Sequence, residues 1–374
     1  MKVQVNMINV ENGDAIIVEL FENENSAVIL IDGGRKGYYH SRLQPTLARI
    51  LAEHEKEGPD LVVCTHYDQD HIEGIINVLD EYQNKVRRVW VHQHSADLKE
   101  QIKLAKVVLE GKVPPLDFLE RKEFTKAQEV LGLLEKSEFD IEELNLVIES
   151  IIDLETLYEM IARINKGCRE NGLEEIIVEH PVKGHQLENW PQFIVEGPTR
   201  EYLEDCFKNF KNTKAFLLEE SQKDIQLNRE LLLANYELQE GRPSPCEELA
   251  VSSRISATNR SSIICSVEGE LGNYLFTGDA GIKSFSSIPN WETQLEGLFW
   301  LDVPHHGSWN NTSKRMIEVF KPKFAFVSGE AEDNRPHWAI KACLEEKGAS
   351  VEVTNDPKNT IVLGIDTKGK TYRK

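Results

Sequence analysis

The chain has 374 residues, of which 40% are hydrophobic, so it is long enough for one large domain or two smaller ones with a substantial core. Its formal net charge of -20 makes the surface as a whole a poor sequence-independent binder of nucleic acid, although bound cations can reverse the sign locally. The sequence holds no run of about eighteen apolar residues, which argues against a membrane span.

The cysteines and the N-terminus both bear on the compartment. The cysteines lie far apart with no CxxC pair, which argues against a zinc knuckle or a disulfide framework and indicates a reducing compartment. The first six residues alternate like a strand and lack the apolar core of a signal peptide. We therefore expect a cytoplasmic protein that does not contact a membrane. The cysteines are Cys64, Cys168, Cys206, Cys246, Cys265 and Cys343.

Residues 1–95 are predicted to form the first half of an α/β unit, as short strands followed by helices. The turn Asp32-Gly33-Gly34 follows the third strand candidate, and Pro45 lies in the first turn of a helix, where proline is tolerated. The predicted strands are 3–10, 15–20, 27–31, 61–64 and 89–91, and the predicted helices are about 45–55 and 72–82.

Two later stretches interrupt this pattern. Residues 96–175 are rich in Glu, Lys and Leu, and apolar residues recur at helical spacing from Leu144 to Ile164. We predict a helical insertion there that packs on the core or on a partner. An irregular stretch runs from about 211 to 256 and includes the loop sequence GRPSP at 241–245. The rest of 176–374 is expected to resume the alternation of strands and helices and to form the second half of the unit.

The densest chemical signal is the sequence CTHYDQDH at positions 64–71. Four metal-capable side chains, His66, Asp68, Asp70 and His71, follow directly after the apolar run 61–63. An apolar run of this kind is typical of a strand buried on both faces, and open α/β sheets carry their sites at the C-terminal ends of such strands. Imidazole and carboxylate together suit a divalent ion such as zinc, manganese or iron.

Three further polar motifs each follow a strand candidate. Asp32 follows 27–31, Asp279 follows 274–276 within the sequence TGD, and the pair His305 and His306 follows 298–303 within the sequence PHHGS. Carboxylates and imidazoles delivered repeatedly to strand ends indicate one shared site built from segments far apart in the chain.

In these motifs the chain resembles the metallo-β-lactamase fold superfamily. Its HxDxDH motif, with GD and PHHGS downstream and NRSS at 259–262, is most similar to the hydrolase domain of the ComEC DNA-uptake channel family. The resemblance covers about residues 1–95 and 250–370, but not the helical middle. It implies a four-layer αββα sandwich with a helical insertion, in which the metal site lies at one edge between two sheets.

The resemblance also implies roles for individual residues. Asp32 resembles the aspartate that braces the ligand loop from behind. One of the two neighbouring histidines of PHHGS corresponds to the last histidine ligand, and His305 is favoured. The ligands implied are His66 and Asp68 at a first metal position, Asp70 and His71 at a second, Asp279 as the carboxylate that bridges them, and His305.

Two departures from the family pattern leave the metal and its count open. Asp68 replaces the commoner histidine, which shifts the preference toward harder ions such as Mn²⁺. A third histidine between the first motif and Asp279 is not evident. His180 and His185 are available there, but each is favoured as a surface residue. We therefore expect Zn²⁺ or Mn²⁺, as one or two ions per chain.

A divalent ion at such a site lowers the pKa of bound water and neutralises a phosphoryl oxygen. By analogy, Asp70 orients the water and takes its proton, and His306 protonates the leaving group or contacts phosphate. Arg335 could also contact an anionic substrate. The candidates for substrate contact, each of which could equally cap a loop or start a helix, are Asn259, Ser262, Ser308 and His337.

The resemblance to the ComEC hydrolase domain implies a metal-dependent phosphodiesterase, and among these a nuclease on DNA or RNA, with the helical insertion as a candidate surface for a protein partner. The alternative substrate is a small phosphodiester or a lactone, which fits the acidic charge better and the motif variant less well. A third hypothesis is a non-catalytic scaffolding subunit that holds metal for structure only. The nearly complete set of ligand motifs argues against it.

Overall fold

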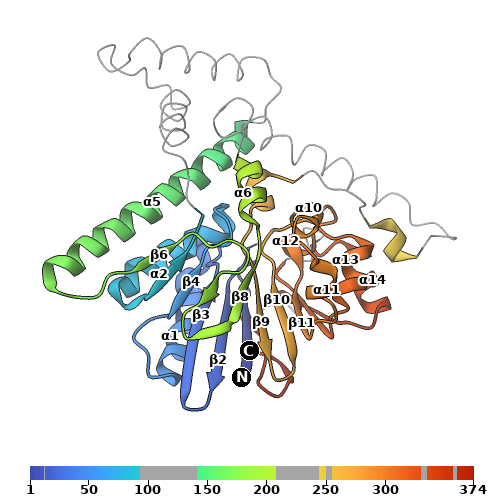
Figure 1. The fold of residues 1–374 in the computed structure, drawn as a ribbon, viewed down its shortest axis with the longest axis horizontal. Helices are drawn as coiled ribbons and strands as arrows, with labels where there is room; N and C mark the ends of the chain where they lie inside the picture. Colours follow the sequence, from blue (N-terminus) through green and yellow to red (C-terminus); the bar gives the residue numbers. More distant parts are fainter. Residues whose placement is uncertain (12, 93–140, 208–243, 250–254, 330–334, 357–359) are drawn as a thin grey trace, which may run out of the picture.

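A computed structural model of the chain describes residues 1–11, 13–92, 141–207, 244–249, 255–329, 335–356 and 360–374. It contains two mixed β-sheets with helices, so the chain belongs to the α/β class (Figure 1). None of the described helices combines the length and the apolarity needed to cross a membrane.

The first sheet has eight strands in the order β15-β14-β1-β2-β3-β4-β5-β6. Strands β1 to β3 pair antiparallel, whereas β3 to β6 pair parallel. As a result β1, β3, β4 and β5 all end at the same edge of the sheet. The bounds are β1 Lys2–Ile8, β2 Ile16–Glu22, β3 Asn25–Ile31, β4 Leu61–Val63, β5 Arg88–Trp90, β6 Ile177–Glu179, β14 Val362–Ile365 and β15 Thr371–Arg373.

The second sheet has seven strands in the order β13-β12-β11-β10-β9-β8-β7. Here β10 to β13 pair parallel, so these strands also end at one edge. The bounds are β7 Gln186–Leu187, β8 Trp190–Gly197, β9 Ile264–Gly269, β10 Gly272–Phe276, β11 Trp300–Asp302, β12 Phe324–Val327 and β13 Ser350–Val353.

The helices flank the sheets (Figure 1). The α-helices are α1 Gln44–Glu53, α2 Gln69–Tyr82, α5 Ile141–Asn171, α6 Arg200–Phe207, α9 Ala257–Arg260, α10 Ile282–Ser286, α11 Trp291–Gln294, α12 Pro304–Gly307, α13 Lys314–Phe320 and α14 Trp338–Glu346. Shorter helical turns are η1 Lys36–Tyr38, η2 Tyr39–Leu43, η3 Gln83–Lys85 and η6 Pro245–Glu248.

Three buried apolar clusters hold these layers together. The first joins the outer face of the first sheet to α1, α2 and α5 and includes Leu47 and Leu157. The second contains residues of both sheets, such as Met7 and Phe193, so the sheets pack face to face. The third joins the second sheet to α10, α13 and α14 and includes Ile340. Because many strands are buried on both faces, their sequences are apolar runs rather than alternations.

The strands and helices predicted within residues 1–95 agree with the structure, with one consequential difference. Helix α2 begins at Gln69, three residues before the predicted start, so Asp70 and His71 lie in its first turn and not in a loop. Three strands between the insertion and the irregular stretch, β6 to β8, were not predicted individually. Of the predicted insertion, residues 96–140 lie outside the described residues, as does most of 211–256. The described part, α5, packs along α2.

The expectation that the cysteines form no disulfide is wrong at two positions. Cys246 in η6 and Cys343 in α14 form a disulfide, and both are buried. The two residues are 97 positions apart, and only the docking of η6 on α14 brings them together, so their spacing along the chain carried no signal. Because disulfides are rare in reducing compartments, the cysteines no longer indicate a reducing compartment for this protein.

Reduction of this disulfide is expected to lower the free energy of unfolding by about 2–4 kcal/mol, because the cross-link restricts a long loop in the unfolded chain. Urea denaturation of the oxidised and the reduced protein measures the difference. The double variant Cys246→Ser/Cys343→Ser is the control, since its stability should not respond to reductant. Equal unfolding midpoints for oxidised and reduced wild-type protein would contradict the expectation.

Candidate metal centre

The polar motifs that follow the strands meet at the edge where both sheets end. Asp32 follows β3 and His66 follows β4 in the first sheet. Asp279 follows β10, and His305 and His306 follow β11 in the second sheet. The face-to-face packing of the sheets brings these two sets together, because the parallel strands of both end at this common edge.

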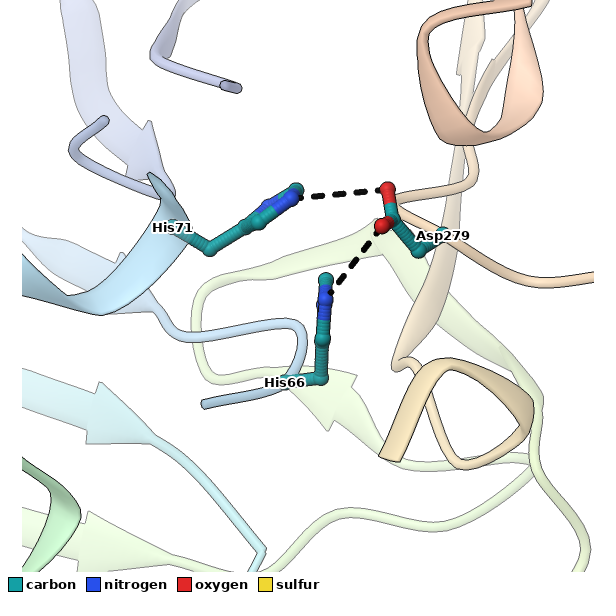
Figure 2. A group of neighbouring side chains, drawn as sticks. All are labelled: His66, His71 and Asp279. Atoms are coloured by element: carbon teal, nitrogen blue, oxygen red, sulfur yellow. Dashed lines mark ion pairs between the residues drawn. The ribbon is translucent and has the colours of Figure 1, made fainter. Parts of the chain in front are cut away.

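The carboxylate of Asp279 lies at the centre of the cluster. Its Oδ1 lies 3.4 Å from His71 Nε2, and its Oδ2 lies 3.5 Å from His66 Nε2 (Figure 2). Figure 2 shows the two imidazoles approaching the carboxylate from the side of the first sheet, with Asp279 on the side of the second. The centre therefore depends on the packing of the two sheets.

The other candidate ligands divide between the two oxygens of Asp279. On the Oδ1 side, His306 Nε2 lies 3.8 Å from Oδ1 and 3.7 Å from Asp70 Oδ2. On the Oδ2 side, His305 Nε2 lies 3.3 Å from Oδ2. Asp68 joins this second side through His66, whose Nε2 lies 3.7 Å from Asp68 Oδ2. The site thus has two halves that share one carboxylate.

The residues present fit a divalent ion. Four buried atoms, the Nε2 atoms of His66, His71 and His306 and the Oδ1 atom of Asp279, have no hydrogen-bond partner in the described part of the chain. Donors that share a tetrahedral zinc lie roughly 3.3 Å apart, since each is about 2.0–2.1 Å from the ion. The separations within each half approach this value. Sets such as His66, His71 and Asp279, and Asp70, His71 and His306, have ligand atoms within 4.8 Å of one another.

The other nitrogen of each imidazole is held by a hydrogen bond that sets its tautomer. His71 Nδ1 lies 2.9 Å from an Asp32 carboxylate oxygen, which can only accept. His66 Nδ1 lies 3.0 Å from Thr65 Oγ1, whose hydroxyl donates to Asp32, so His66 Nδ1 is the donor in its own contact. The Nε2 atoms of both histidines then carry the lone pair that a metal needs.

His306 is held in the same way, through a serine, by Asp14, a residue that the sequence reasoning missed. Its Nδ1 lies 2.9 Å from Ser328 Oγ, and that hydroxyl donates to Asp14. Asp14 is buried, and its second carboxylate oxygen lies 3.9 Å from His71 Nδ1. The signal for Asp14 was present, because this aspartate follows β1, whose C-terminal end is at the same edge as those of β3 and β4.

His305 differs from the other three histidines in its exposure and in its partner. Its side chain is 17% exposed, and its Nδ1 lies 2.9 Å from Asn311 Oδ1. Asn311 in turn donates to the backbone oxygen of Asp279. Both His305 and His306 have left-handed backbone conformations, with φ of 51° and 55°, so consecutive side chains point to different halves of the site.

The electrostatics of the cluster reflect its many opposed charges. Burial raises the pKa of Asp279, but the surrounding imidazoles outweigh it and hold this pKa well below the usual range. Burial lowers the pKa of His306, but Asp14 and Asp279 raise it to about 10. The pKa of His71 is also raised, by Asp279 and Asp32 against burial. Buried carboxylates and imidazolium groups of this kind stabilise each other, and a bound metal cation would neutralise the carboxylates in place of the imidazolium protons.

The four residues proposed for substrate contact lie around the cluster in different roles. Asn259 Nδ2 donates to Asp279 Oδ2 at 3.2 Å, and Ser262 Oγ lies 3.4 Å from His66 Nδ1, so both support ligand residues. His337 caps α14, since its Nδ1 accepts a hydrogen bond from Ala339 N. Ser308 is the buried last residue of the PHHGS turn, and its amide donates to His305 O.

Neither histidine considered as the missing third ligand lies in the cluster. His180 Nδ1 donates to the backbone oxygen of Val91 at 2.7 Å. His185 Nε2 lies 3.5 Å from Glu179, and its ring contacts Trp90. In both cases the imidazole has a partner at the β5–β6 edge of the first sheet.

Comparison with known proteins gives no family assignment beyond this geometry. No protein-family model matches the chain, and a search of curated proteins finds no match.

A close contact between two glycines holds the turn that contains Asp32 against helix α2, which carries Asp70 and His71. Gly33 N donates to His71 O, and Gly74 N donates to Gly34 O, both at 2.8 Å. A Cβ at Gly74 would lie 1.9 Å from Gly33 O, so helix α2 can approach the Asp32 turn this closely only because both residues lack side chains.

The variant Gly74→Ala is therefore expected to lose about 1–3 kcal/mol of stability, although alanine favours helices, because the Asp32 turn must move away from α2. Its affinity for Zn²⁺ should fall as well, since His71 loses its brace. Thermal unfolding and calorimetric Zn²⁺ titration measure both effects. Gly37→Ala is the matched control, because nothing lies within 4 Å of that position. Wild-type metal affinity in Gly74→Ala would show that the contact does not position His71.

Proposed function

We propose that this chain is a metal-dependent phosphodiesterase with the metallo-β-lactamase fold, acting on DNA or RNA. The observation that carries the proposal is the convergence, at the common edge of two packed sheets, of four buried ligand atoms that have no hydrogen-bond partner among the described residues. The helix–sheet–sheet–helix order of the layers and the HxDxDH, GD and PHHGS motifs support the four-layer αββα sandwich of that superfamily.

The two halves of the cluster suggest how two ions would be held. Asp70, His71 and His306 would hold one ion with Asp279 Oδ1, whereas His66, Asp68 and His305 would hold the other with Asp279 Oδ2. This division uses both histidines of PHHGS, where the family pattern implied one, and it gives His305 the place of the missing third histidine. The mixture of imidazole and carboxylate donors suits Zn²⁺ or Mn²⁺.

Ions bound there would supply hydroxide at neutral pH and neutralise charge on the phosphoryl group. The chain's own residues then have distinct tasks. Asp70 has a lowered pKa, because burial is outweighed by His306 and His71, so it stays ionised and accepts a hydrogen bond from the attacking water. His306 is fully buried among ligands, so its proposed role shifts from proton donor to ligand. Ser308 is the candidate for hydrogen bonding to the phosphate.

The cytoplasmic location and the protein partner are further parts of this proposal. We place the protein in the cytoplasm, where nucleic acid is available as substrate, and infer a protein partner on the insertion. The apolar face of α5 packs on α2, so the partner would engage the opposite face, where Glu159 and Lys166 are exposed.

Replacing each histidine of PHHGS separately tests the ligand division. His306→Ala should reduce the bound Zn²⁺ from two ions to one, because the Oδ1 half loses a buried donor. His305→Ala should weaken the ion of the other half. Metal content after dialysis, measured by atomic emission, gives both results. His180→Ala is the control, since that imidazole lies outside the cluster. An unchanged metal content in His305→Ala, with turnover reduced, would instead make His305 a proton donor.

Incubation of the Zn²⁺- or Mn²⁺-loaded protein with single-stranded DNA, duplex DNA and RNA tests the activity. Cleavage should depend on the metal and fall by on the order of a hundredfold or more in Asp70→Ala, which loses a group that orients the water. Asp80→Asn is the matched control, because Asp80 lies on the same helix and is exposed. Hydrolysis of small diesters or lactones without cleavage of polymers would favour the alternative substrates. Metal-dependent folding with no turnover on any substrate would favour the scaffolding subunit.

A further inference from the structure

The loop that follows β12 returns to the metal centre and docks on the PHHGS turn. His337 N donates to Gly307 O at 2.9 Å, and Pro336 packs on the same residue. A Cβ at Gly307 would lie 2.5 Å from Pro336 Cβ, and Gly307 has φ of 73°, so glycine is required for this contact. Arg335, the residue before Pro336, is thereby fixed beside the metal centre.

The positive charge of Arg335 acts on His305 of the cluster, and Arg335 has no anionic partner among the described residues. Burial lowers the pKa of His305 to about 4; the charge of Asp279 opposes this shift, and the positive charge of Arg335 adds to it. No ion pair or side-chain hydrogen bond of Arg335 occurs within the described residues, although its side chain is half-buried. By contrast, Lys314 and Arg315, on the neighbouring helix α13, are both paired with glutamates. Half-buried charges normally have partners.

Among the described residues, the cluster cannot supply a carboxylate to Arg335 without losing a candidate ligand, so we look for the partner of Arg335 in the substrate. A guanidinium presents a planar fork of donors that matches two oxygens of a phosphate group. An anionic diester that approaches this centre needs positive charge beyond that of the bound metal ions, because five carboxylates surround the centre. These belong to Asp14, Asp32, Asp68, Asp70 and Asp279. A lactone or another neutral ester has no such need.

We propose that Arg335 is the specificity-determining residue of the site and binds the non-bridging oxygens of a phosphodiester held at the metal centre. This inference rests on the proposed function and deepens it, because it restricts the substrate to esters with a negative charge at the reacting group. The contact is electrostatic and bidentate, so lysine replaces it only in part.

The direct test is the affinity of the Zn²⁺-loaded protein for inorganic phosphate, measured by isothermal titration calorimetry. Arg335→Gln should bind phosphate on the order of tenfold or more weakly, and Arg335→Lys should lie between it and the wild type. Arg87→Gln is the matched control, since Arg87 is exposed, pairs with Glu174 and precedes β5 at the opposite edge of the sheet. Each variant must retain the metal content of the wild type; loss of metal from Arg335→Gln would overturn the inference in favour of a structural role.

Kinetics separate this inference from the proposed function. With bis(p-nitrophenyl) phosphate, Arg335→Gln should raise KM by on the order of tenfold, while hydrolysis of p-nitrophenyl acetate is unchanged. Diester hydrolysis with the same KM in Arg335→Gln and wild type would overturn the role of Arg335 and leave the phosphodiesterase standing. Phosphate binding that weakens in Arg335→Gln, in a protein that hydrolyses no diester, would support the anion site and overturn the phosphodiesterase. Absence of phosphate binding by the wild type would overturn the anion site.

Discussion

Buried negative charge at the common edge of two sheets is the constraint on which the rest of this structure depends. Asp14, Asp32 and Asp279 are each at most 2% exposed, and an uncompensated carboxylate in such a place is very unfavourable. The imidazoles around them compensate it in part, through direct contacts and through Thr65 and Ser328. The Nε2 atoms of His66, His71 and His306 have no hydrogen-bond partner among the described residues, and each lies within 3.8 Å of a carboxylate oxygen of Asp279. Bound metal cations at this centre would balance the remaining negative charge of the buried carboxylates.

The fold satisfies this constraint because each of the two sheets supplies part of the buried cluster. The first sheet supplies His66 and His71 with the carboxylates that orient them, and the second sheet supplies Asp279 and the PHHGS turn. The apolar cluster between the sheets fixes the separation of these two sets. Any shift of one sheet against the other therefore changes the distances between the candidate metal ligands of the two sheets. The packing of the core thus determines the geometry of the metal centre.

The sequence indicated the parts of the site that depend on strand order alone. Asp32, His66 and Asp279 follow apolar strands, and parallel strands deliver such residues to one edge. The choice between His305 and His306 could not be made this way, because it depends on two consecutive left-handed residues that turn neighbouring side chains apart. The Cys246–Cys343 disulfide was hidden for a related reason: it depends on the docking of two helical segments far apart in the chain.

The acidic composition and an anionic substrate are compatible if recognition is local. A surface with a net charge of -20 repels a polyanion at long range, and association would be slow and sensitive to salt. Positive charge within the centre acts at contact distance, where screening is weak and the surrounding dielectric is low. Recognition through Arg335 and bound cations would thus favour a short stretch of substrate at the reacting phosphate over the extended backbone grip of a basic surface. Binding of long nucleic acid would then require a partner that adds the missing positive surface.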